Sequence, residues 1–164
     1  MSYDLRKWVA ESQTARKRSR WTRYYLAAGI FAGILFAIAD LFDPGFGSKS
    51  WAANPAIAFL LLGVVPLSPF GRESWMTEKG RATFDEFERN ALSAATTRAY
   101  ATLITVIMLG MVYLWIASIA AWPVPTAPRQ WAALTYLLVG LGLALPVFYA
   151  ELLVPLPPAE GDDE

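Results

Sequence analysis

The chain has 164 residues and no net charge; 55% of its residues are hydrophobic, and it contains neither cysteine nor histidine. The absence of these two residue types excludes disulfides, thiolate and imidazole metal sites, and catalysis by a histidine base or a cysteine nucleophile. The apolar residues are gathered into four long blocks. A soluble domain of this length could not bury those blocks, because too little polar surface would remain to cover them. We therefore expect an all-α membrane protein with four transmembrane helices.

Residues 1–23 form a basic segment before the first apolar block. That block is longer than the core of a signal peptide and lacks a small-residue cleavage site, so we interpret it as a permanent anchor. A basic segment beside a span is typical of the cytoplasmic surface, where anionic lipids, rather than nucleic acid, are the nearest partner. The basic residues that we expect at this surface are Arg16, Lys17, Arg18, Arg20 and Arg23.

The first span is predicted over residues 24–42, and its 19 residues reach roughly 28 Å, the thickness of the hydrocarbon core. Gly29, Gly33 and Ala37 recur at every fourth position. Small residues at this spacing allow a second helix to approach closely, and packing is what holds helices together in lipid. These three are the predicted helix-packing residues. We favour a contact with another span of the same chain, and a dimer interface is the alternative.

The second span, over residues 51–67, is short. Asn54 and Pro55 are typical of a helix start, with asparagine as the N-cap and proline in the first turn. Pro66 and Pro69 predict a sharp end. A re-entrant half-helix is the alternative to a full crossing.

The distribution of basic residues favours the full crossing. With four crossings, twelve of the 14 lysines and arginines lie in the N-terminal segment and in the loop 68–99, on one side of the membrane. Only Lys49 and Arg129 lie on the other side. This bias predicts that the N-terminus, the loop and the C-terminus are cytoplasmic.

The loop 68–99 precedes a long predicted helix. Thr83 and Glu86 fit a capping box, which predicts a helix start near residue 83. Nothing from there to Trp122 breaks a helix, so one helix should run from the cytoplasmic surface through the third span, residues 100–122. Its first turns form a candidate docking helix that comprises Phe84, Asp85, Phe87, Glu88 and Arg89.

Pro123, Pro125 and Pro128 predict a rigid turn before the fourth span, residues 131–153. Pro146 lies inside this span and should bend it. Residues 155–164 are proline-rich and acidic, and we expect this tail to be disordered. The predicted organisation is thus a basic segment 1–23, a membrane domain 24–154 and a tail 155–164.

The sequence contains no recognisable catalytic, cofactor-binding or metal-binding pattern. Asp40 and Glu151 lie near opposite ends of their spans, where we expect both carboxylates to reach interfacial water. The hydroxyl groups within the spans are expected to bond their own helix or a neighbouring one. These residues are Thr102, Thr105, Tyr113, Ser118, Thr135 and Tyr136.

These features favour a structural, accessory-subunit or scaffolding protein of a bacterial inner membrane, with no catalytic chemistry of its own. Its expected partner is another membrane protein or a second copy of the chain. One alternative is a homo-oligomeric minimal transporter or channel. A further alternative is a lipid or quinone binder whose apolar pocket is lined near the outer interface by Trp115, Trp122, Trp131 and Tyr136, although an aromatic belt explains these residues equally well.

Overall fold

The computed structural model describes residues 20–42, 54–72, 75, 77 and 84–154, and these residues form helices and turns, with no strand. The three helices that are long and apolar enough to cross a membrane are α2 (Arg20–Phe42), α6 (Glu86–Ala120) and α7 (Pro128–Leu153). The shorter elements are α3 (Pro55–Phe59), the π-helical turn η1 (Leu60–Val64), the 3₁₀ turn η2 (Val65–Leu67) and α4 (Pro69–Arg72). The all-α prediction is therefore confirmed. Most of the basic segment and the whole acidic tail lie outside the described residues.

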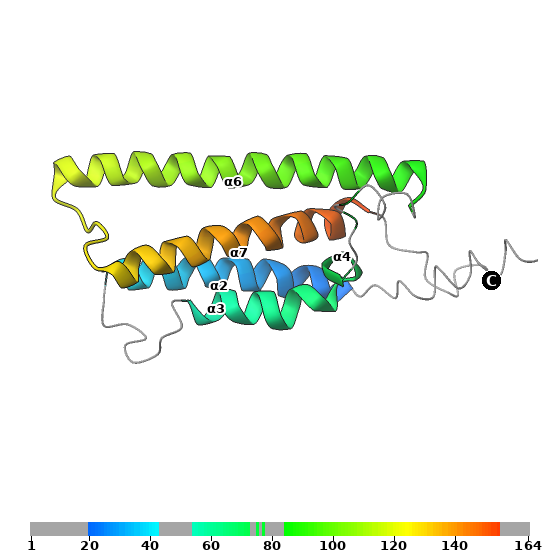
Figure 1. The fold of residues 1–164 in the computed structure, drawn as a ribbon, viewed down its shortest axis with the longest axis horizontal. Coiled ribbons are helices and arrows are strands. Elements are labelled where there is room, and N and C mark those ends of the chain that lie inside the picture. The colour runs from blue at the N-terminus through cyan, green and yellow to red at the C-terminus, as the bar shows by residue number, and fades with distance from the viewer. Residues whose placement is uncertain (1–19, 43–53, 73–74, 76, 78–83, 155–164) are drawn as a thin grey trace, which may run out of the picture.

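Helix α7 occupies the centre of the molecule, with α6 on one side and α2 and α3 on the other (Figure 1). The bundle has two ends, which we call the Arg23 end and the Asp40 end. The Arg23 end holds the start of α2, α4, the start of α6 and the end of α7. The Asp40 end holds the end of α2, the turn 121–127 and the start of α7.

The second predicted span is shorter in the structure than in the sequence analysis. Asn54 caps α3 as predicted, since its Oδ1 accepts from the backbone N–H of Ile57 at 3.2 Å. Its Nδ2 also donates to the backbone oxygen of Gly33 at 2.9 Å, so the segment begins partway along α2. The helical residues 55–67 extend about 20 Å at 1.5 Å per residue, less than the roughly 30 Å hydrocarbon core. Three helices are therefore long and apolar enough to cross a membrane, and residues 43–53 lie outside the described residues.

This short segment nevertheless leads the chain back to the Arg23 end. The helix widens into a π turn and tightens into a 3₁₀ turn around Pro66, which has no N–H to donate. The segment ends at Ser68, whose side chain bonds Glu151 near the end of α7.

The packing of α2, α3 and α7 depends on glycines. A Cβ atom added to Gly33 of α2 or to Gly140 of α7 would collide with the side chain of Ile57, and one added to Gly29 would lie 2.7 Å from Cδ1 of Leu60. Ile57 and Leu60 are fully buried. Small residues thus let the short segment approach two long helices at once, which is how helices gain dispersion contacts in lipid.

Helix α6 begins at Glu86, three residues after the predicted start. Its capping box is made by Asp85 and Glu88, not by Thr83 and Glu86: the N–H of Glu88 donates to Asp85 at 2.7 Å, and that of Asp85 donates to Glu88 at 3.4 Å. The helix then runs unbroken to Ala120. It ends where Ala121 adopts a left-handed conformation, with φ of 54°, before the proline-rich turn.

Contact between α6 and α7 is close near the Arg23 end and opens towards mid-helix. Leu92, Ala95 and Ala99 are buried, and Thr102 bonds the hydroxyl of Tyr149 at 2.8 Å. Gly110 lies on the same helical face as Leu92 and Ala99, given 100° per residue. It is nevertheless exposed, and a Cβ atom there would meet nothing within 4 Å.

Paired glycine substitutions test this packing. Gly33→Ala should lower the free energy of unfolding by about 1–3 kcal/mol, because the new methyl group displaces Ile57. Gly110→Ala removes a glycine from open space and should leave stability unchanged or raise it by about 0.5–1 kcal/mol. Unfolding of the purified protein by a denaturing detergent measures both. Equal losses for the two variants would contradict the observed packing.

Candidate functional site

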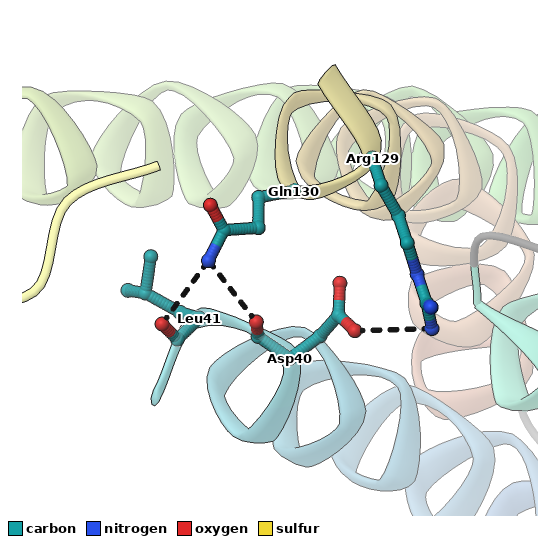
Figure 2. Close-up of polar contacts among 4 residues, drawn as sticks. All are labelled: Asp40, Leu41, Arg129 and Gln130. Carbon is teal, nitrogen blue, oxygen red and sulfur yellow. Dashed lines mark hydrogen bonds and ion pairs between the residues drawn. The ribbon is translucent and has the colours of Figure 1, made fainter. Parts of the chain in front are cut away.

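Gln130 joins the ends of two helices at the Asp40 end (Figure 2). Its Nε2 donates to the backbone oxygens of Asp40 and Leu41, at 3.4 and 3.3 Å, in the last turn of α2. Its Oε1 accepts from the backbone N–H groups of Thr126 and Ala127, at 2.8 and 3.0 Å, just before α7. Backbone groups at helix ends lack partners within their own helix. One buried amide therefore satisfies the C-terminus of α2 and the N-terminus of α7 together.

An ion pair accompanies this amide. Nη2 of Arg129 lies 3.3 Å from Oδ1 of Asp40, and the Asp40 side chain is only 7% exposed whereas that of Arg129 is 33% exposed. The second carboxylate oxygen of Asp40 is buried and has no hydrogen-bond partner in the described part of the chain. The arginine lies near the negative end of the α2 dipole and the aspartate near the positive end of the α7 dipole, so each charge suits the neighbouring helix.

A second polar cluster lies at the Arg23 end. The buried hydroxyl of Ser68 donates to Oε1 of Glu151 at 2.6 Å and accepts from the N–H of Phe70 at 3.1 Å. The indole N–H of Trp75 donates to the backbone oxygen of Phe70 at 2.8 Å. The Phe70 ring packs on Trp75 and on Phe84, at centroid distances of 6.4 and 6.3 Å. Glu151 thus bonds Ser68 at the break between η2 and α4, and Phe70 connects this break to the aromatic cluster.

The expectation that Asp40 and Glu151 reach interfacial water is wrong. Asp40 is 5% exposed and Glu151 is fully buried. Each residue lies near a helix end, as predicted, but it is covered by neighbours that the sequence does not indicate. The two carboxylates lie at opposite ends of the bundle, since Asp40 pairs with the start of α7 and Glu151 lies near its last residue. They do not form a carboxylate pair.

The predicted helix-packing residues lie inside the bundle. Gly29 and Gly33 face Leu60 and Ile57 of the same chain, and Ala37 is buried. Both glycines therefore contact another segment of the same chain. This agrees with the favoured interpretation, a contact within the chain, rather than with the dimer alternative.

The predicted surface residues are placed in part. Arg16, Lys17 and Arg18 lie outside the described residues, and the side chain of Arg20 is not described. Arg23 is half-buried, and its Nη2 donates to the backbone oxygen of Val154 at 3.5 Å.

The five residues of the candidate docking helix differ in their exposure. Phe84 precedes α6 and is buried in the aromatic cluster, so it is not available at the surface. Asp85, Phe87 and Arg89 are exposed, and Glu88 is half-buried beside the cap. The exposed part of the predicted docking surface is the first turn of α6, and Phe87 is its large apolar side chain.

Five of the predicted hydroxyl groups in the spans form hydrogen bonds within the chain: those of Thr102, Thr105, Tyr113, Ser118 and Thr135. Thr105, Ser118 and Thr135 bond backbone oxygens of their own helices. The hydroxyl of Tyr113 donates to the backbone oxygen of Pro123 at 2.8 Å, which holds the turn against the end of α6. This agrees with the expectation for such residues.

The described residues contain no group of three or more acidic residues that could hold a metal ion. Their buried polar side chains contact backbone atoms, or one another, near the two ends of the bundle and around Asn54. Such an arrangement stabilises helix ends and helix pairs. Searches among protein-family models, curated proteins and solved structures give no match to the chain.

Replacement of Gln130 tests the joint between α2 and α7. Gln130→Met keeps the length of the side chain but leaves backbone groups of both helix ends unpaired, so the free energy of unfolding should fall by about 1–3 kcal/mol. Thr135→Val, which removes a bond within one helix at an exposed position, is the matched control and should change little. A Gln130→Met protein as stable as this control would contradict the assignment.

A double-mutant cycle tests the ion pair. Arg129→Gln leaves the Asp40 carboxylate buried without its cation, and stability should fall by about 1–3 kcal/mol, less than for a fully buried pair because Arg129 is partly exposed. Adding Asp40→Asn removes the uncompensated charge and should restore most of the loss. The measurement is again detergent-induced unfolding. Additive losses in the double variant would show that the two side chains do not interact.

Proposed function

We propose that the protein is a multispanning inner-membrane protein with a structural, accessory-subunit or scaffolding role and no catalytic chemistry of its own. The observation that carries this proposal is the uneven burial of its helices. Only 6% of the most apolar 18-residue stretch of α6 is buried, against 22% in α2 and 39% in α7. Helix α6 therefore presents a long apolar surface that the described part of the chain leaves uncovered.

The proposed topology has four crossings and places both termini in the cytoplasm. The Arg23 end is then cytoplasmic, because α2 begins there and the loop after Leu67 starts there. The second crossing is the predicted span 51–67, of which the structure describes residues 54–67. The bias of basic residues towards one side supports this arrangement.

The internal use of polar groups supports a role without chemistry. Gln130 and Asn54 bond backbone atoms of other segments, and Ser68 bonds Glu151. A transport path or active site needs polar groups directed at a substrate. The bundle is better suited to presenting α6 to a neighbour, with the exposed first turn of α6 at the cytoplasmic surface.

A second candidate, a binder of lipid or quinone tails, is favoured by the opening at Gly110. On α7, Trp131 is half-exposed and Thr135 is exposed. The hydroxyl of Thr135 bonds its own helix, which leaves apolar atoms to receive a hydrocarbon chain.

Purification in a gentle detergent, followed by size analysis and mass spectrometry, tests the first proposal. We expect a stoichiometric membrane-protein partner that is lost with Met108→Ala/Met111→Ala on exposed positions of α6. Phe31→Ala/Leu35→Ala, on exposed positions of α2, is the matched control and should retain the partner. A monomer that always runs alone would contradict the proposal, and a homo-oligomer with nothing else attached would favour the transporter or channel alternative.

A further inference from the structure

Arg98 is an exposed cation on α6 at the point where the apolar part of this helix begins. Residues 99–128 carry no charged side chain, so Arg98 is the last charge before a long uncharged stretch. It forms no hydrogen bond or ion pair with the residues that the structure describes, whereas Arg129 is paired with Asp40. An arginine beside a hydrocarbon core directs its guanidinium group towards the lipid headgroups.

The surroundings of Arg98 on α6 hold no acid. Side chains three or four positions apart on a helix are neighbours, and those around Arg98 are uncharged: Ala94, Ala95, Ala101 and Thr102. Glu88 lies ten positions earlier, about 15 Å away along the helix axis. Glu151, near the end of α7, is fully buried and accepts from Ser68. Among the described residues, no carboxylate therefore neutralises this arginine.

A pair of hydroxyl groups lies one helical turn further along α6. The hydroxyl oxygens of Thr102 and of Tyr149, on α7, are 2.8 Å apart, and both side chains are half-buried. Thr96, Thr97 and Thr105 each donate to the backbone oxygen four positions earlier, but the hydroxyl of Thr102 bonds α7. One O–H of the pair makes this bond, and the other has no acceptor among the described residues. The pair therefore retains one hydrogen-bond donor.

These groups follow one another along α6 in the order of the parts of a phospholipid. Arg98 and Thr102 lie on the same face of the helix, about 6 Å apart along its axis. The half-buried side chains of Leu103 and Val106 come next, and the open space at Gly110 follows. From the Arg23 end inwards, α6 thus presents a cation, a neutral donor and an apolar surface. A glycerophospholipid has its phosphate, its ester oxygens and its hydrocarbon chains in the same order.

We propose that Arg98, Thr102 and Tyr149 bind one anionic phospholipid of the leaflet at the Arg23 end. The guanidinium group of Arg98 donates to the phosphate, and the hydroxyl pair donates to an ester oxygen. A lipid with a net negative charge is favoured, because the ammonium group of a zwitterionic headgroup competes with Arg98 for the phosphate. The site goes beyond the proposed function, since a protein partner on the exposed face of α6 neither requires nor excludes it.

Lipid titration of the purified full chain tests the role of Arg98. Native mass spectrometry in a nonionic detergent measures the dissociation constants of phosphatidylglycerol and of phosphatidylcholine with the same acyl chains. We expect the unmodified protein to prefer phosphatidylglycerol by about five-fold or more, and Arg98→Gln to remove this preference. Arg89→Gln is the matched control. It changes an exposed arginine of the same helix, whose Nε donates to the backbone oxygen of Asp85, and it should keep the preference.

A second pair of variants tests the hydroxyl groups. Tyr149→Phe removes the spare donor, because the hydroxyl of Thr102 is then able to bond its own helix as the other threonines of α6 do. Both lipids carry the same ester groups, so both should bind about two- to five-fold more weakly, with the preference for phosphatidylglycerol unchanged. Thr102→Ser keeps a hydroxyl at this position and should bind both lipids as the unmodified protein does.

Three results would overturn the site. The first is an Arg98→Gln protein that prefers phosphatidylglycerol as strongly as the unmodified protein. The second is an equal loss of preference in Arg98→Gln and Arg89→Gln, which would show a general effect of surface charge. The third is displacement of the lipid by an excess of glycerol phosphate, which has the phosphate but no hydrocarbon chains. That result would assign the arginine to a soluble phosphate compound.

Discussion

Ile57 fills the space left by two glycines, Gly33 on α2 and Gly140 on α7, and this contact fixes how closely three helices approach. In lipid the apolar surface of a helix gains little by leaving its solvent, so packing and hydrogen bonds determine which helices associate. Asn54 reinforces the contact by bonding both the start of α3 and the backbone of Gly33. The short segment can therefore join the bundle although it is only 13 residues long.

Polar clusters at the two ends of α7 connect this helix to α2 and to the end of the short segment 55–67. Gln130 and the Asp40–Arg129 pair join the start of α7 to the end of α2, and Glu151 joins its last turn to Ser68. Buried polar groups are costly unless they are bonded, so each cluster favours one register of the helices over alternatives. Both carboxylates lie near helix ends, which spares the protein a charge at the middle of the bilayer.

Helix α6 stands apart from this arrangement. It packs mainly on α7, through small residues near the Arg23 end, and exposes most of its apolar surface. At its start the capping box of Asp85 and Glu88 fixes the helix beside the aromatic cluster around Trp75. A single continuous helix thus connects the aromatic cluster at its start with the uncovered apolar surface.

The sequence by itself determined the features that depend on neighbouring residues. These are the bounds of the long helices to within a few positions, the cap at Asn54, and the end of the short segment at its prolines. The capping box of α6 was displaced by two positions, because Asp85 and Glu88 offer the same chemistry as Thr83 and Glu86.

Only the tertiary structure decided that Asp40 and Glu151 are buried, that Gln130 joins two helix ends, and that Phe84 belongs to the interior. Gln130 lies three positions after Ala127, and glutamine at that position can bond the N-terminal backbone of a helix. The sequence therefore indicated the contacts of Gln130 at the start of α7, but not those on α2. Its partners on α2 lie some 90 positions away. Contacts between residues so far apart in the sequence depend on how glycines and side chains pack between helices. Short sequence patterns therefore do not predict them.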